Sequence, residues 1–385
     1  MNIFLDWAAT APPDPEIFQE TCDTALTCYG NPSSIHAAGQ KSASKLAEAR
    51  QKCAEALNVK PQTIVFTSGG TEAGHLPLLA LLRRPVQGTL AISAIEHPAV
   101  IEQARILAHC GWKTLIIPAT GEGFITPEAV LSTIRDDTAY VAVMAVNNET
   151  GAVQPVEEIA AGIADRTKGK KKPFFHVDIV QAAGKIPVNL NCPEIDSAAV
   201  SAHKLGGPRG IGLLYHKKRF EPFIMGGGQE SGIRPGTENI AGAWGLAACL
   251  VKNCRSPADD RSYSMAEYII ESLCSVPGIA PVPETRKPDD RRFSPYIFQF
   301  TNSMFPGEVL VRILSERGIF ISTGSACSSR SRARPVLQAM HVKPEKQLGA
   351  FRVSTGKSTT KQDIDCLTET LKDIYQKNKM HTKKE

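Results

Sequence analysis

The sequence of 385 residues has no long apolar run and only a small excess of charge of one sign. Its most apolar stretch, residues 76–82, is far shorter than the ~18 residues of a membrane span, and Pro77 interrupts it. The net charge of +5 gives no indication of a nucleic-acid or membrane partner. The N-terminus has no basic segment followed by an apolar one, so we expect a cytoplasmic protein.

The sequence also lacks closely spaced cysteine pairs of the kind that bind metal ions, and it lacks the common nucleotide-binding loops. The ten cysteines are scattered without a C-x-x-C pair, a spacing that disfavours a zinc site and is typical of reduced thiols. Neither a Walker A loop nor a G-x-G-x-x-G motif occurs, which argues against the usual mononucleotide and dinucleotide folds.

Helical patterns alternate with short apolar runs over residues 36–250. Helices are predicted at 36–57, 98–109, 127–134 and 239–252, and strands at 64–66, 89–93, 139–146, 174–177, 198–201 and 211–215. Several of the runs are apolar throughout, which is typical of strands covered on both faces. The sequence therefore predicts an α/β fold with a mostly parallel sheet and helices on both sides.

A polar stretch at residues 253–261 indicates a domain boundary. Beyond it, helices are predicted at 263–275, 307–317 and 360–376, and strands at 296–301 and 319–322. We predict a large domain of residues 12–255, and a small α+β domain formed by residues 1–11 and 256–385.

Polar side chains follow five of the predicted strands. Because ligands collect at the carboxyl ends of parallel strands, we expect these segments to line one site. They are residues 67–72, 96–97, 147–151, 178–181 and 201–204.

Three features of these segments indicate a phosphate-bearing cofactor. The small residues around Gly70 and Thr71 precede a helix and could bind a phosphate, although such a turn is as often only structural. Asp178 ends a strand and needs a cationic partner, which a protonated pyridine nitrogen would supply. A lysine at the position of Lys204 is usually a surface residue, but beside such a cofactor it could form a Schiff base. Together they indicate pyridoxal 5′-phosphate (PLP).

Several motifs, spread over nearly the whole chain, resemble those of one family. They are LDWAAT (5–10), GNPSSIH (30–36), VNNETG (146–151), HVD with Gln181 (176–181), SAHK (201–204), GGGQE (226–230), GTEN (236–239) and STGSACSS (322–329). With them the sequence resembles the group I cysteine desulfurases of the class V aminotransferase superfamily. The resemblance implies PLP fold type I, in which the large domain contains a mostly parallel sheet of the seven-stranded type. It also implies a homodimer that converts L-cysteine to L-alanine and passes the sulfur to an iron–sulfur scaffold or another acceptor protein.

The resemblance also implies roles for single residues. The catalytic residues would be Cys327, which takes the sulfur as a persulfide on a loop of the small domain, Lys204, which holds PLP and moves protons at Cα, and His97, which stacks on the ring. Asp178 would pair with the pyridinium nitrogen, and Gln181 and Asn148 with the ring oxygen. The phosphate ligands would be Gly70, Thr71, Ser201, His203 and, from a second subunit, Thr237. Arg352, with Asn31 and Asn148, would bind the substrate carboxylate. No intrinsic metal site is expected, and Cys327 would contact a transferred iron–sulfur cluster only through its persulfide.

Some positions differ from the family pattern, namely Trp7, His75, Ser231 and the arginines 330, 332 and 334. Cations beside Cys327 favour its thiolate form. A PLP-dependent aminotransferase or lyase, a selenocysteine lyase-like enzyme and a non-catalytic sulfur-relay protein are the alternatives. The cysteine in the loop before Arg352 favours a desulfurase over a transaminase, and the retained Lys204 and Asp178 favour an enzyme over a relay protein.

Overall fold

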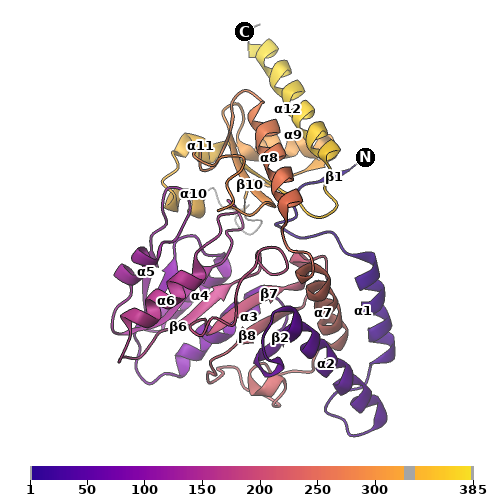
Figure 1. Cartoon of the computed structure of the whole chain (residues 1–385), viewed down its shortest axis with the longest axis vertical. Coiled ribbons are helices and arrows are strands. Elements are labelled where there is room, and N and C mark those ends of the chain that lie inside the picture. Colours follow the sequence, from indigo (N-terminus) through magenta and orange to yellow (C-terminus); the bar gives the residue numbers. More distant parts are fainter. Residues whose placement is uncertain (1, 325–333, 383–385) are drawn as a thin grey trace.

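The computed structural model describes residues 2–324 and 334–382, without the side chains of 379–382. Its main element is a seven-stranded sheet with the order β2-β8-β7-β6-β5-β3-β4 (Figure 1). The strands are β2 (Ile64–Thr67), β3 (Thr89–Ser93), β4 (Lys113–Ile117), β5 (Thr138–Met144), β6 (Phe174–Asp178), β7 (Ser197–Ser201) and β8 (Gly212–His216). Only β8 runs antiparallel to its neighbours, so the predicted mostly parallel sheet is confirmed.

Helices cover both faces of this sheet because its central strands are apolar on both sides. In β5, Val141 and Val143 belong to one buried cluster, and Tyr140 and Ala142 belong to another. The first cluster includes residues of α1 (Pro15–Thr27), α2 (Ala37–Ala56), α5 (Pro127–Thr133), α6 (Val156–Arg166) and α7 (Ile240–Cys254). The opposite face is covered by α3 (Gly70–Leu79) and α4 (Pro98–His109).

Local capping explains why several helix boundaries follow from the sequence. Thr126 accepts a hydrogen bond from the Ala129 amide and Pro127 opens α5, while Asn239 caps α7 in the same way. Several elements differ from the prediction, and α1 and α6 were not predicted. The strand predicted to reach residue 146 ends at Met144, where the Asn147 side chain turns the chain by accepting from the Glu149 and Thr150 amides. The half-exposed edge strand β4 was not predicted, although its sequence KTLII ends in three apolar residues.

The C-terminal part of the chain has its own core. An antiparallel sheet of β9 (Ile279–Pro281), β10 (Ile297–Asn302) and β12 (Ala350–Ser354) packs with α8 (Asp260–Cys274), α9 (Gly307–Glu316) and α12 (Lys361–Thr382). The short helices α10 (Pro335–Ala339) and α11 (Pro344–Leu348) complete this part. The N-terminal strand β1 (Ile3–Phe4) pairs with β11 (Ile319–Phe320), so the start of the chain lies in this C-terminal part (Figure 1). The exact domain boundaries remain a prediction.

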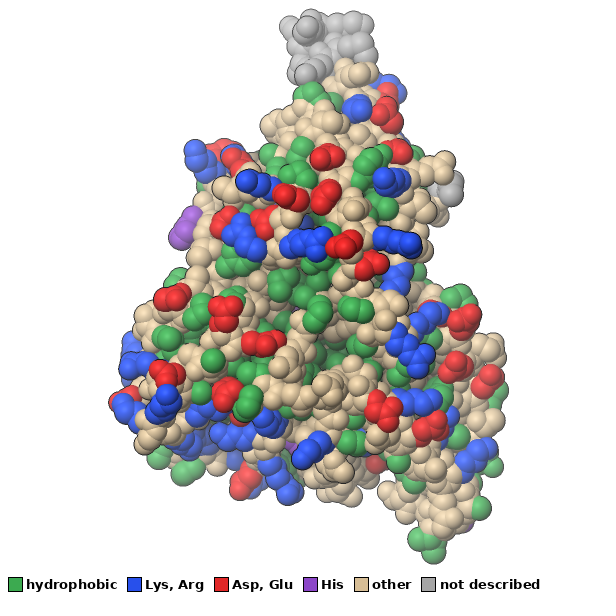
Figure 2. Space-filling model, in the orientation of Figure 1, with side chains coloured by type: hydrophobic (Ala, Val, Ile, Leu, Met, Phe, Trp, Pro, Cys, Tyr) green, Lys and Arg blue, Asp and Glu red, His purple; other side chains and the backbone are tan. Residues whose placement is uncertain are grey.

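On the face shown in Figure 2, acidic and basic side chains are interspersed, and apolar side chains gather in the hollow between the upper and lower parts. Within the described residues, no helix is long and apolar enough to span a membrane. The nine cysteines of the described segments all carry free thiols.

The buried carboxylate of Glu230 fixes the loop that follows β8. It accepts hydrogen bonds from both terminal nitrogens of Arg50, at 2.8 and 2.7 Å, and from the Phe66 amide at 2.8 Å. Glu230→Ala would leave a partly buried guanidinium and a buried N–H group without this partner. We expect a loss of about 3 kcal/mol in unfolding free energy. Such a loss lowers the melting temperature by roughly 5 °C or more in a thermal unfolding scan.

The matched control is Glu221→Ala, which removes an exposed carboxylate that lies 3.7 Å from Arg83. It should change the unfolding free energy by less than about 0.5 kcal/mol. Equal melting temperatures for the two variants would contradict the importance of the Arg50–Glu230 pair.

Candidate active site

A cavity of about 420 Å³ lies at the carboxyl ends of the parallel strands. All five polar segments that follow these strands contribute to its wall, joined by Ala8, Ala9, Arg209 and Arg352. The predicted site residues that line it are Gly70, Thr71, His97, Asn148, Asp178, Gln181, Ser201, His203, Lys204 and Arg352. This volume lies within the usual range for small-molecule sites, roughly 300–1,000 Å³.

Three predicted site residues are not part of this wall. Asn31 is exposed, and its side chain accepts a hydrogen bond from the Ser33 amide at 2.9 Å. Thr237 is exposed in the loop before α7. Cys327 lies outside the described residues.

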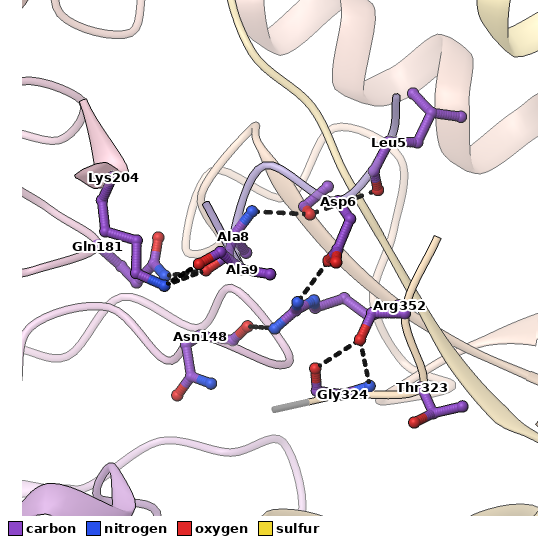
Figure 3. Close-up of polar contacts among 12 residues, drawn as sticks. Leu5, Asp6, Ala8, Ala9, Asn148, Gln181, Lys204, Thr323, Gly324 and Arg352 are labelled. Atoms are coloured by element: carbon purple, nitrogen blue, oxygen red, sulfur yellow. Dashed lines mark hydrogen bonds and ion pairs between the residues drawn. The ribbon is translucent and has the colours of Figure 1, made fainter. Parts of the chain in front are cut away.

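The amine of Lys204 points to the N-terminal segment of the chain. Its Nζ donates to the carbonyl oxygens of Ala8 at 2.6 Å and Ala9 at 2.7 Å (Figure 3). The Gln181 Nε2 atom donates to the same Ala8 oxygen at 2.9 Å. One backbone carbonyl therefore aligns two of the predicted cofactor ligands.

Burial shifts the pKa values of several ionisable groups in the wall, among them Asp178 and His97. Burial raises the pKa of Asp178 to about 6, against the hydrogen bond from the Val180 amide at 2.8 Å and the charge of Lys204. Burial, together with the charge of Lys204, lowers the pKa of His97 to about 4. His97 is therefore neutral near pH 7. Its Nδ1 atom accepts from the Ala99 amide at 3.1 Å, so Nε2 carries the proton.

Arg352 on β12 is almost fully buried, with 1% of its side chain exposed. Its terminal nitrogens donate to the Asn148 carbonyl at 2.8 Å and to Asp6 Oδ1 at 2.7 Å (Figure 3). Its Nε atom is buried without a partner in the described part of the chain. An arginine with an unused, buried N–H beside a cavity is suited to bind a carboxylate.

The residues present fit PLP. The N-terminus of α3 opens at the cavity without a side-chain cap, which suits a phosphate. A Cβ atom at Gly70 would lie 2.7 Å from Val180 Cγ2, so only glycine allows this close approach. The structure shows no ion pair for Asp178 among the described residues, and a pyridinium would supply one. The described residues contain no cluster of three or more His, Cys, Asp or Glu side chains that could hold a metal ion.

Some residues of the site were not found by sequence reasoning. His176 lines the cavity, and its Nε2 atom is buried without a partner in the described residues. It precedes Asp178 by two positions on β6, so the two-residue period of a strand could have indicated it. The roles of Asp6 and of the Ala8 and Ala9 carbonyls had no comparable signal, because they depend on backbone contacts across the fold.

Comparison with known proteins agrees with this geometry. Residues 3–367 match the aminotransferase class-V family. The chain belongs to this family. It is 33% identical to the cysteine desulfurase IscS of Dictyoglomus turgidum, over 98% of this chain and 95% of that protein. It is 35% identical to the NifS/IcsS protein homolog of Lactobacillus delbrueckii subsp. bulgaricus, over 97% of both chains.

Solved structures show the same similarity. A NifS-like protein superimposes with a TM-score of 0.88 at 32% identity, covering 98% of this chain and 100% of that one. The structure of SspA in complex with cysteine gives a TM-score of 0.78 at 28% identity, covering 92% and 98%. PLP is the cofactor of this family, and the predicted fold type is confirmed.

The raised pKa of Asp178 predicts a pH dependence of the cofactor-free protein. The folded state binds this proton more tightly than the unfolded state, so ionisation of Asp178 destabilises the fold as the pH rises. From pH 5 to pH 7 this loss should be roughly 1 kcal/mol, and Asp178→Asn should remove it. Urea unfolding of the cofactor-free proteins at both pH values measures the difference.

Asp289→Asn, at an exposed position, is the control and should retain the wild-type pH dependence. If Asp178→Asn also retained the wild-type pH dependence, Asp178 would not titrate in this range. With PLP bound, Asp178→Asn should no longer be more stable than the wild type at pH 7, because the wild-type carboxylate then has a cationic partner.

Proposed function

We propose that this chain is a PLP-dependent cysteine desulfurase, which converts L-cysteine to L-alanine and leaves the sulfur as a persulfide on Cys327. The observation that carries the proposal is the cavity in which an amine (Lys204), a buried carboxyl group (Asp178) and a buried guanidinium (Arg352) face one space. Relatives that are named cysteine desulfurases match over almost the full chain, and the similar protein SspA has been solved with cysteine.

Each of these groups has a separate task. When bound, PLP withdraws electrons from the substrate Cα and thereby weakens the bond to sulfur. Asp178 holds the pyridine nitrogen in its protonated form, and Gln181 and Asn148 hydrogen-bond the ring oxygen. The first turn of α3, with Gly70, Thr71, Ser201 and His203, holds the phosphate. Lys204 binds the cofactor and moves a proton at Cα, while neutral His97 lies against the ring.

Arg352 orients the substrate by its carboxylate. Its Nε and Nη2 atoms offer the paired N–H geometry that a carboxylate requires, which a lysine cannot reproduce. Asp6 already holds one of these nitrogens. The guanidinium is therefore fixed before the substrate arrives, and less conformational freedom is lost on binding.

The overall transfer balances without a further reactant. The Cβ–Sγ bond of L-cysteine breaks, and an S–S bond forms between this sulfur and Cys327. Of the two thiol hydrogens, one from the substrate and one from Cys327, one ends on alanine Cβ and the other on the persulfide. The described ends of the loop that contains Cys327 lie beside Arg352. Ser322 pairs with the backbone of Arg352, and Arg334 Nη1 donates to the Thr323 carbonyl at 2.6 Å. Cys327 is five positions after Ser322, and five steps of extended chain span at most ~17 Å, enough to reach a substrate held by Arg352.

We expect Lys204→Ala to form no alanine from L-cysteine, because both cofactor attachment and proton movement lose their amine. Cys327→Ser should bind PLP and change its visible spectrum with L-cysteine, yet release little alanine or sulfide. After one turnover of the wild type, mass spectrometry should find one added sulfur on the peptide that contains Cys327.

Cys366→Ser is the matched control, because Cys366 is an exposed thiol on α12. It should retain full activity. An added sulfur on another cysteine, or full activity of Cys327→Ser, would refute the assignment and favour an aminotransferase.

A homodimer and a sulfur-acceptor protein, such as an iron–sulfur scaffold, are part of this proposal. Thr237 and Asn31 lie outside the cavity of their own chain, near exposed apolar residues. Ile35 is 93% exposed, and Met225 is 67% exposed. If a second copy covered these residues, Thr237 of one copy would reach the cofactor phosphate of the other copy. A stable, active monomer with bound PLP in analytical ultracentrifugation would disprove this part of the proposal.

A further inference from the structure

Lys185 lies directly behind the active-site wall, in the turn region that follows β6. Its Nζ atom donates to Gln181 Oε1 at 3.3 Å. The structure gives this ammonium group no other hydrogen bond or ion pair within the described segments. Two further cavities, of about 390 and 380 Å³, are both lined by Gly184 and Lys185, and Lys204 also lines the second of them. Lys185 thus lies between Gln181 in the active-site wall and these two cavities.

The contact with Lys185 fixes which end of the Gln181 amide faces the active site. A lysine ammonium can only donate, so it requires the oxygen end of the amide. The nitrogen end then donates to the Ala8 carbonyl at 2.9 Å, and Gln181 lines the cavity that Lys204 also lines. Figure 3 shows Gln181 and Lys204 meeting at this carbonyl. A continuous polar chain runs from Lys185 through Gln181 and Ala8 to Lys204.

This chain connects two half-buried amines. Burial, with the charges of Lys204 and Arg352, lowers the pKa of Lys185 to about 7. Repulsion between two cations is mutual, so a charge on Lys185 disfavours a charge on Lys204. An amine must lose its proton before it can act as a nucleophile or base.

Other charged groups face these two amines from several elements. Asp6, His97, Asp178, His203 and Arg352 lie around Lys204. The titratable groups that line the cavities at Lys185 include Asp14, Glu157, Lys204, Lys252, Cys254 and Lys357. Substitution of Lys185 leaves all of them in place, so its own contribution can be measured.

We propose that Lys185 is a positioning residue of the active site, which holds the Gln181 amide with its N–H groups toward the cofactor and keeps positive charge off the Lys204 nitrogen. This inference rests on the proposed function, because it assumes that Lys204 binds PLP. It assigns a role in the reaction to a residue that does not contact the substrate.

The test follows the visible absorption of the PLP-loaded protein as a function of pH, without substrate. Lys185→Met removes both the charge and the hydrogen bond, and should raise the midpoint of the spectral titration by about 0.5 to 1 pH unit. Lys185→Gln, which can still donate to Gln181 but has no charge, should raise it by a similar amount. Lys185→Arg keeps its charge at high pH, so its midpoint should equal or fall below that of the wild type.

Lys357→Met is the matched control, because Lys357 lines one of the same cavities without a contact to Gln181. It should leave the midpoint within about 0.2 pH unit of the wild type. An unchanged midpoint in both Lys185→Met and Lys185→Gln, or an equal shift in Lys357→Met, would overturn the inference.

The hydrogen bond to Gln181 has a separate readout. Lys185→Met should weaken PLP binding relative to Lys185→Gln, because only Met leaves the Gln181 oxygen without its donor. Equal dissociation constants for PLP would refute the positioning role. If instead the wild type showed no visible PLP band at all, the proposed function itself would fail. A normal wild-type band with unshifted Lys185 variants would refute this inference alone.

Discussion

The ion pair between Asp6 and Arg352 joins the start of the chain to its last strand, and the active site depends on it. The two residues are 346 positions apart in the sequence, yet Asp6 Oδ1 lies 2.7 Å from Arg352 Nη2. A guanidinium with 1% of its side chain exposed needs such a partner, because burial removes its hydration. Backbone bonds extend the connection: the Ala8 amide donates to Ser354 Oγ, and the Ala11 amide donates to the His203 carbonyl. The segment 6–11 thereby fixes Arg352 and Lys204 relative to each other.

The charged residues around the cavity favour an anionic ligand. Burial raises the pKa of Glu96 to about 8, aided by Asp178, so this carboxyl group is largely neutral at pH 7. Among the residues that line the cavity, three are basic (Lys204, Arg209 and Arg352) and two are acidic (Glu72 and Asp178). A ligand with one phosphate and one carboxylate would compensate this excess of positive charge.

Much of the fold could be predicted from the sequence because its strands are buried on both faces. The runs at 89–93 and 174–177 are apolar and short, and they appear as β3 and β6 with nearly the same bounds. The half-exposed β4 was missed, although Leu115, Ile116 and Ile117 form an apolar run as long as that of β2. The sequence could predict that Asp178 and Lys204 line the same site, because both follow parallel strands and ligands bind at the carboxyl ends of such strands. The position of Arg352 could not be predicted in this way, because it depends on contacts between distant segments.

At the site itself, the contacts made by backbone groups could not be predicted from the sequence. The carbonyls of Ala8 and Ala9 hold Lys204, but alanine side chains give no sign of this role. When Lys204 binds the cofactor, it must release at least part of these contacts. Gln181 then still holds the Ala8 carbonyl, and Ser354 Oγ still holds the Ala8 amide. The N-terminal segment thus keeps two side-chain contacts at one residue when the lysine leaves. The wall of the site can retain its shape while its central amine moves, which a catalytic lysine requires.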